Sequence, residues 1–345
     1  MKKYGLTVDI GTTTVTAGII DVASGKELVS LVDFNPQAKF GQDVISRIDY
    51  CIKNKAGLGK LHNAITGCVK NMSQRLVKEA GIKGTEIKRR VFVGNAAMEH
   101  FFLKIPPGKL AEAPYVSGLP RGIIEAPGKV YFLPVIKSFV GSDLTAGILY
   151  VKLLQKSGPS LFVDIGTNGE MALFSNKKLF VTSTAAGPAF EVSDKGLLGS
   201  DIINVVASML ADGIIDKSGK LLGAKSKITQ NDIRRIQVAK AAITAGIKAL
   251  MSKAGLDFKD LKNLYVSGKF GNLINKDAAI KIGLLPGINK NRIKFIGNSA
   301  YKGAVLALCS ESAMKKSESI ADKAIHLSLF ARKDFQDEFV KNMRF

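Results

Sequence analysis

The chain has 345 residues, of which 46% are hydrophobic, and its 50 basic and 29 acidic residues give a formal net charge of +21. This length and composition describe a globular protein with room for two hydrophobic cores and exclude a disordered chain. No uncharged apolar run of 18 residues and no signal-peptide pattern occurs, so we expect a cytoplasmic protein without a membrane span or membrane partner.

Cysteine, histidine and basic residues narrow the classes of site further. The three cysteines are far apart and lack CxxC spacing, which indicates a reducing compartment and no disulfide framework. An iron–sulfur cluster usually needs four thiolates, so we expect none held by this chain, and no histidines have the spacing of a zinc site. The basic residues are dispersed, which favours a solvated basic surface or an acidic protein partner over nucleic acid.

The first half of the chain begins with predicted strands. Apolar, β-prone residues predict a strand at 4–10, a glycine turn with a further strand, and another strand at 28–34. Apolar residues at helical spacing then predict helices at 43–50 and 61–80. The remaining predicted elements of this half are a strand at 90–94, a helix through 102, a proline-punctuated loop at 105–134 and a long helix at 139–155.

The second half repeats this order. A strand at 161–165 runs into another glycine turn, strands continue to residue 184, and a glycine- and alanine-rich loop follows at 185–190. The repeat at domain scale predicts an α/β layered architecture. The later predicted elements are helices at 200–211 and 230–254, strands at 264–268 and 294–296, a helix through 308, and mixed helix and strand at 316–345.

The two glycine turns carry nearly the same phrase, VDIGTTT at 8–14 and VDIGTNG at 163–169. Glycine permits a tight turn whose N–H groups approach a phosphate, and threonine hydroxyls add donors. Asp9 and Asp164 precede the turns, where a carboxylate can hold a hydrated Mg²⁺. We therefore expect a duplicated domain whose hairpins grip one polyphosphate. The expected phosphate-binding residues are Gly11, Thr12, Thr13, Thr14, Gly166, Thr167, Asn168 and Gly169.

Together with GKFG at 268–271 and GNSA at 297–300, these hairpins resemble the ATPase core shared by actin, sugar kinases and heat-shock chaperones. Other phrases are more specific and resemble the C-terminal ATPase domain of the reductive activators of corrinoid proteins over nearly the whole chain. They are NPQ at 35–37, GQDVISRI at 41–48, GNAAMEH at 94–100, VGSD at 140–143, DIGTNGE at 164–170, AAGPAFE at 185–191 and GLLP at 283–286.

The resemblance implies a duplicated actin-like (ribonuclease H-like) ATPase fold, with two mixed-sheet subdomains around a nucleotide cleft. We expect one subdomain from residues 1–145 plus 299–345 and the other from 146–298. The implied activity is an ATPase that uses ATP and Mg²⁺ to drive reduction of a partner corrinoid protein from Co(II) to Co(I). Such activators usually also carry an iron–sulfur domain. Because this chain lacks the cysteines for such a domain, the resemblance implies a separate ferredoxin or other iron–sulfur donor, or a removed electron-carrying segment. The resemblance also implies a homodimer.

The resemblance assigns roles to further residues. Asp143, at the start of a predicted helix, matches an acidic residue that orients water or metal in such ATPases. The alternative for Asp143 is an ordinary helix N-cap. Asp9 and Asp164 are the other two expected catalytic carboxylates. Glu170 either acts similarly or faces solvent. Gly187 is expected beside the ribose or phosphates, unless its loop is only a packed turn.

Two sets of residues retain alternatives of their own. Gly268, Phe270 and Gly271 resemble an adenosine-binding turn, although Phe270 taken alone is more typical of a core aromatic. Asn35, Gln37, Asp43 and Arg47 suit either a turn followed by an amphipathic helix, or a cleft or partner surface. Alternative functions on the same core are a small-molecule kinase and a nucleotide-gated interaction or filament protein.

Overall fold

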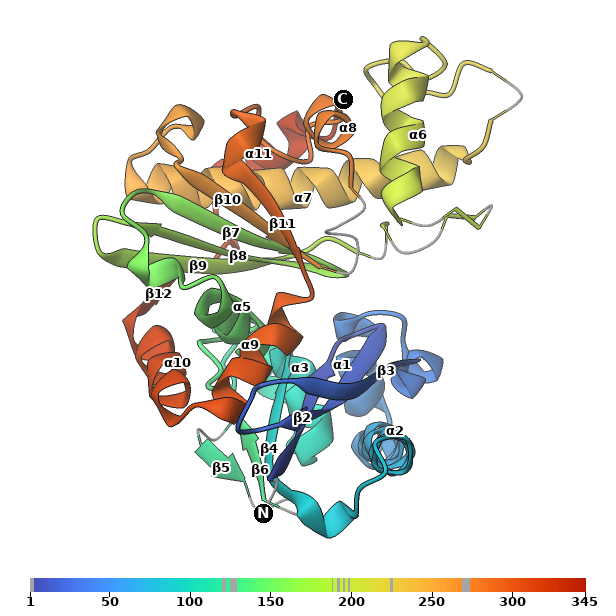
Figure 1. Cartoon of the computed structure of the whole chain (residues 1–345). Helices are drawn as coiled ribbons and strands as arrows, with labels where there is room; N and C mark the ends of the chain where they lie inside the picture. The colour runs from blue at the N-terminus through green and yellow to red at the C-terminus, as the bar shows by residue number, and fades with distance from the viewer. Residues whose placement is uncertain are drawn as a thin grey trace. The chain divides into compact units, whose positions relative to one another are not determined.

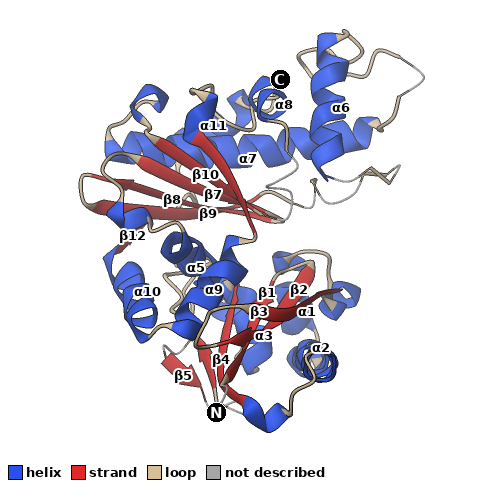
Figure 2. Ribbon diagram, viewed as in Figure 1, coloured by secondary structure: helices blue, strands red, loops and turns tan. Residues whose placement is uncertain are grey.

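The structure is a computed structural model that describes residues 3–119, 122–124, 129–187, 189–190, 193–194, 196–197, 199–223, 226–268 and 274–345. The chain divides into two compact units, each built on its own sheet (Figures 1 and 2). The first unit comprises Met1–Lys152 and Ser299–Ala324, and the second comprises Leu153–Asn298 and Ile325–Phe345.

The first unit contains a mixed sheet of six strands. Its strand order is β3-β2-β1-β4-β6-β5. The first three strands in sequence form antiparallel pairs, whereas β4 lies parallel to both β1 and β6. The strands are β1 (Tyr4–Ile10), β2 (Thr14–Asp21), β3 (Glu27–Phe34), β4 (Ile87–Gly94), β5 (Gly122–Ile124) and β6 (Val130–Phe132).

Helices cover both faces of this sheet. Leu308 of α9 packs directly on Gly5, whereas Leu6, the next residue of β1, faces α2 across the other side. Because successive strand residues point to opposite faces, α2 and α9 lie on opposite sides of the sheet. The helices of this unit are α1 (Val44–Lys53), α2 (Gly57–Glu79), α3 (Ala96–Leu103), α4 (Gly108–Ala111), α5 (Ser142–Tyr150), α9 (Ser299–Cys309) and α10 (Glu311–Lys323).

The second unit is built on a sheet in the order β11-β10-β7-β8-β9-β12, with the long helix α7 packed against β8 and β9 (Figure 1). Its strands are β7 (Ser160–Ile165), β8 (Asn168–Ser175), β9 (Lys178–Ala185), β10 (Asn263–Ser267), β11 (Ile293–Gly297) and β12 (Ala324–His326). Its helices are α6 (Gly199–Ala211), α7 (Gln230–Ala254), α8 (Lys276–Lys281) and α11 (Lys333–Lys341).

The two sheets have the same topology. The order β3-β2-β1-β4-β6 in one corresponds strand for strand to β9-β8-β7-β10-β11 in the other, with antiparallel and parallel pairs in the same places. Each sheet also has its own buried apolar cluster. The predicted α/β fold of two duplicated mixed sheets is therefore confirmed. Within the described residues, no helix is both long and apolar enough to cross a bilayer.

Two predicted features differ from the structure. Residues 325–345 belong to the second unit, not the first, because Leu327 N donates to Val181 O of β9 at 2.8 Å and α11 packs on α7. The buried ammonium group of Lys240 on α7 donates to the carbonyl oxygens of Asn342 and Arg344, and burial lowers its pKa to about 8.

The helix predicted at 139–155 is shorter than expected. Residues 137 and 140 form a β-bridge before it, and α5 ends at Tyr150. Lys152 then adopts a left-handed conformation with φ of 52°, which separates α5 from a short 3₁₀ turn at Leu153–Gln155. The apolar spacing continued through this break because both segments bury apolar residues.

Candidate functional site

The first hairpin closes with a four-residue turn. Ile10 and Val15 are the last paired residues of β1 and β2, and Gly11 N donates to Thr14 O at 2.9 Å. Asp9 lies one residue before the end of β1, between Thr16 of β2 and Val93 of β4. Residues 11–14 thus form a compact loop where β1 and β2 meet, directly after Asp9 and Ile10 of β1.

Two asparagines from outside the hairpin hold this loop. Asn35 Nδ2 donates to Gly11 O at 2.8 Å, and Asn35 N donates to Thr13 O at 2.8 Å. Asn95 Nδ2 donates to the hydroxyl oxygen of Thr12 at 3.0 Å. Each asparagine also accepts a backbone N–H at the start of the helical turn that follows it. The loop conformation is therefore tied to two helix starts.

The polar residues that follow Asn35 support it from within the core. Gln37 and Arg47 are both fully buried, and Gln37 Nε2 donates to Leu61 O while Arg47 Nε donates to Gly41 O. Asp43 forms a capping box with Ser46 at the start of α1. Asn35, Gln37 and Arg47 thus form a buried scaffold behind the hairpin, whereas Asp43 is half-buried at the start of α1.

The start of α5 lies against the same loop. Ser142 Oγ is within hydrogen-bonding distance of both the N–H and the carbonyl of Gly94, the residue paired with Ile10. The N-cap of α5 is Gly141, and Asp143 lies inside the first helical turn, where its Oδ1 accepts from Leu144 N. The N-cap alternative for Asp143 is therefore wrong, and its carboxylate lies at the positive end of the helix.

Glu99 of α3 completes this network and was not singled out from the sequence. Its Oε1 lies 2.5 Å from Ser142 Oγ, and its side chain is 2% exposed. Burial raises the pKa of Glu99 well above its usual range; the Ser142 hydrogen bond opposes this, and the charge of Asp143 adds to it. Ser142 Oγ donates to Glu99 Oε1 and accepts from Gly94 N, so the serine links α3 to the end of β4.

Glu99→Gln is expected to change the pH dependence of stability. Native Glu99 keeps a proton that the unfolded chain releases above about pH 4.3, so the free energy of unfolding falls as pH rises toward the native pKa. Glutamine is always neutral and its amide oxygen can still accept from Ser142, so the variant lacks this loss. Urea unfolding should be measured at about pH 5 and about pH 8. Relative to the wild type, the free energy of unfolding of the variant should be higher at about pH 8 than at about pH 5, by up to about 1.4 kcal/mol per pH unit. Parallel pH profiles of the two proteins would refute a protonated Glu99.

The second hairpin is one residue tighter than the first. Ile165 pairs with Gly169, and Gly166 N donates to Asn168 O at 3.0 Å. Asp164 lies directly opposite Glu170 on β8 and beside Ser267 on β10, whose hydroxyl is 2.9 Å from Asp164 Oδ2. Glu170 is only 7% exposed, so the alternative of a solvent-facing strand glutamate is wrong.

Two of the predicted glycines converge on this hairpin. Gly187 N donates to Thr167 O at 2.7 Å. Gly268 has a φ of +118°, and a Cβ there would lie 2.3 Å from Ile165 O, so only glycine fits. Four of the positions singled out from the sequence lie outside the described residues. They are Phe270 and Gly271 of the predicted adenosine turn, and positions 188 and 191 of the AAGPAFE phrase. The second unit thus gathers Asp164, residues 166–169, Gly187 and Gly268.

The carboxylates of the second hairpin suit a hydrated metal ion better than an ion ligated only by protein side chains. In the described part of the chain, no group of three or more His, Cys, Asp or Glu is placed to hold a metal ion. Asp164 and Glu170 lie directly opposite each other on adjacent strands. Two carboxylates in such a pair repel each other, and a nearby cation reduces the repulsion. Mg²⁺ usually keeps several waters and needs only one or two carboxylates beside substrate phosphates. The residues present therefore fit Mg²⁺ that arrives with a nucleotide.

The predicted residues fall into two groups, one in each unit. Asp9, residues 11–14 and Asp143 gather around the start of α5, and the remaining described residues gather at the second hairpin. Sequence reasoning missed Glu99, Ser142 and Ser267 as supporting residues. The phrases GNAAMEH and VGSD contain the first two, but their contact joins positions 43 residues apart.

This architecture, with a glycine hairpin after the first strand of each duplicated sheet, defines the class of actin-like ATPase folds. Residues 4–156 match the family model described as the RACo middle region. Residues 158–194 and 222–345 match the model described as the C-terminal domain of RACo, the ASKHA domain. The chain belongs to the family of reductive activators of corrinoid proteins.

Individual relatives agree with this assignment. The corrinoid activation enzyme RamQ of Eubacterium limosum is 30% identical, over 99% of this chain and 70% of the relative. The [Co(II) methylated amine-specific corrinoid protein] reductase of Methanosarcina barkeri is 24% identical, over 98% of this chain and 76% of the relative. The solved structure of a reductive activator for corrinoid, iron–sulfur protein is 33% identical with a TM-score of 0.92, over 100% of this chain and 66% of that chain. The chain thus spans about two thirds to three quarters of the length of these relatives.

Proposed function

We propose that this protein is an ATP-dependent activator that drives the reductive reactivation of a corrinoid protein from Co(II) to Co(I). The observation that carries the proposal is the 33% identity and TM-score of 0.92 to a reductive activator over the full length of this chain. The two relatives named for corrinoid activation and corrinoid protein reduction support the same activity. Family membership also favours an activator over a small-molecule kinase or a filament protein.

The proposed roles follow from what phosphoryl transfer requires, which is positioning and neutralisation of charge. Residues 11–14 would bind one part of the ATP polyphosphate through backbone N–H groups and threonine hydroxyls, and residues 166–169 another part. Gly187 would let a nucleotide approach the second hairpin closely, because a Cβ there meets no atom within 4 Å. Gly268, Phe270 and Gly271 would serve as the adenosine-binding turn.

The acidic residues would serve the metal and the attacking water. Asp164, supported by Ser267 and opposed by Glu170, would hold waters of Mg²⁺, and Asp9 would do so from the first hairpin. When bound, Mg²⁺ would neutralise charge on the phosphates. Asp143 would orient water, with Glu99 and Ser142 fixing the helix start on which it lies.

The corrinoid cofactor would stay on the partner protein. Electrons would come from a separate ferredoxin or other iron–sulfur donor, and the activator would act in the cytoplasm as a homodimer. Coupling to ATP would make a reduction possible that ordinary cellular donors cannot complete alone.

Calorimetric titration with a non-hydrolysable ATP analogue tests the nucleotide part of this proposal. We expect one site per chain with micromolar-scale affinity in Mg²⁺ and much weaker binding in EDTA, because the phosphates would then lack their counter-charge. No binding in Mg²⁺, or equal binding in EDTA, would contradict a metal-dependent nucleotide site.

A further inference from the structure

Strand β3 is an edge of the first sheet, and its sequence lacks the usual protection of an edge (Figures 1 and 2). It has eight residues and contains neither lysine nor proline, the residues that commonly keep an edge from pairing with another chain. The other described edge strands are protected in known ways. Strands β5 and β12 have three residues each, and β11 carries Lys294.

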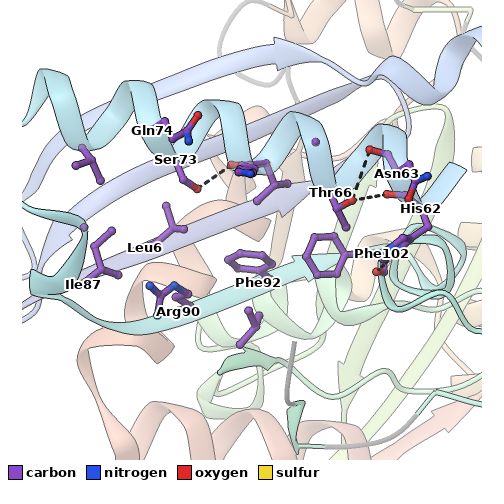
Figure 3. Close-up of a pocket in the computed structure, with 16 residues that line it drawn as sticks. Leu6, His62, Asn63, Thr66, Ser73, Gln74, Ile87, Arg90, Phe92 and Phe102 are labelled. Carbon is purple, nitrogen blue, oxygen red and sulfur yellow. Dashed lines mark hydrogen bonds between the residues drawn. The ribbon is translucent and has the colours of Figure 1, made fainter. Parts of the chain in front are cut away.

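The two faces of the sheet are covered differently near this edge. On one face α2 runs along the sheet, and Figure 3 shows it lying over Leu6 and Phe92. Helix α2 also packs against β2 and β3. On the other face α9 packs mainly on β1 and β4 in the middle of the sheet. It reaches the start of β3 through Tyr301, whose hydroxyl donates to Glu27 Oε2 at 2.6 Å.

The side of β3 that shares a face with α9 is largely exposed. Tyr301 lies against Gly18 of β2, and Gly18 is paired with Ser30 of β3. Because every second strand residue points to the same face, Val32 and Phe34 also lie on the α9 side. Val32 is 62% exposed and Phe34 is 83% exposed. Two large apolar side chains therefore face solvent beside an edge.

The backbone of the same residues is directed away from the sheet. Asn35 N donates to Thr13 O at 2.8 Å, so Asn35 directs its N–H inward, toward the strand that precedes it. This direction alternates along an antiparallel strand, so Ser30, Val32 and Phe34 direct their N–H and C=O groups outward. In the described ranges, β2 is the strand with which β3 pairs. The outer side of β3 thus presents both the polar backbone and the apolar side chains that another strand requires.

We infer that β3 pairs antiparallel with β3 of a second copy of this chain, about a two-fold axis at Leu31. In this register Leu28, which is 41% exposed, lies opposite Phe34 of the other copy, so apolar side chains meet at both ends. Ser30 and Val32 form the two central pairs, in which the copies exchange both N–H···O bonds. This row of four side chains carries no charge, so a second copy brings no like-charge contact into it.

The self-complementary order of the row favours a second copy over an unrelated strand. A two-fold interface uses the same residues on both partners, and the row has apolar residues at both of its ends. The inference rests on the homodimer included in the proposed function and assigns the surface that forms it. It is independent of the nucleotide site, because none of its residues belongs to either glycine hairpin.

Sedimentation equilibrium over a series of protein concentrations tests the surface. Val32→Lys should raise the dissociation constant of the dimer by about 30-fold or more, because an edge lysine opposes strand pairing and the two introduced lysines lie close to each other. The side chain of Val32 is exposed, so the variant should fold. Ile325→Lys is the matched control, since Ile325 is 42% exposed on the edge strand β12 of the other sheet, and it should change the constant by less than about twofold.

Disulfide cross-linking tests the register. Leu31 directs its backbone groups toward β2, so it would form a non-hydrogen-bonded pair with its own copy, with Cα atoms about 4.5 Å apart. Leu31→Cys should therefore give a covalent dimer under mild oxidation. In Val29→Cys the two cysteines would be offset by about 13 Å along the strands and should not cross-link. The three native thiols are common to both variants, and burial raises the pKa of each, which lowers their reactivity.

The outcomes separate this surface from the homodimer itself. A dimer that Val32→Lys leaves intact, or that Ile325→Lys weakens equally, would overturn the inference while leaving the homodimer in place. Equal cross-linking of Leu31→Cys and Val29→Cys would also overturn it. A monomer at every concentration would contradict both the surface and the homodimer, whereas ATP binding is measured separately by calorimetry.

Discussion

Asp164→Asn should reduce Mg²⁺-dependent ATP hydrolysis by about 100-fold or more without unfolding the protein. The substitution removes one negative charge next to the proposed metal position, where Asp164 opposes Glu170 across β7 and β8. Asparagine keeps an oxygen that can accept the hydrogen bond from Ser267, so the strand ends should stay in place. Steady-state hydrolysis measured across a range of Mg²⁺ concentrations should show a lower rate and a higher Mg²⁺ requirement.

Matched variants separate this effect from a general change in charge. Asp9→Asn makes the same change at the first hairpin and should also lower the rate. Asp337→Asn makes it on the exposed side of α11 and should leave the rate unchanged. If both hairpin variants hydrolyse ATP at the wild-type rate, the metal assignment is wrong.

Gly303→Ala should lower the free energy of unfolding by about 3 kcal/mol. A Cβ at Gly303 of α9 would lie 2.0 Å from the carbonyl oxygen of Ala146 in α5, and neither backbone can yield without separating the two helices. This contact fixes α5, whose first turn carries Ser142 and Asp143, against α9 and thereby against β1 and β4. Thermal and urea unfolding should both show the loss.

Gly67→Ala is the control for helix propensity. It makes the same substitution inside α2, where a Cβ meets nothing within 4 Å, and should stabilise the protein by about 0.5–1 kcal/mol. Equal shifts in the two variants would mean that α5 and α9 do not pack as closely as described.

The sequence predicted the repeated hairpins and the duplicated sheets because these features are local. Each strand end and the turn after it lie within one phrase of seven residues, at 8–14 and at 163–169. Both turns lie where the sequence predicted them. Pairing between the strands then follows from repeated connections of similar length. The predicted glycines at 187 and 268 also lie beside the second hairpin.

Features that depend on distant contacts were not predictable in the same way. The three-residue strand β12 has too few residues for a pattern, and its place beside β9 depends on distant contacts. Leu327, directly after β12, donates through its N–H to Val181 O and accepts at its carbonyl from Thr182 Oγ1. The burial of Glu170 could not be read from alternation, because β8 is buried on both faces. The Glu99–Ser142 contact joins two helix starts that only the folded sheet brings together.

The central claim is that ATP drives cobalt reduction in a corrinoid protein, and a reduction assay tests it most directly. The protein would be mixed with a low-potential iron–sulfur donor and a Co(II) corrinoid protein of the kinds named for its relatives, and Co(I) formation followed by absorbance. We expect Co(I) to accumulate with Mg²⁺ and ATP and to remain near background with the non-hydrolysable analogue or with Asp164→Asn. Equal Co(I) formation with and without ATP would contradict the account.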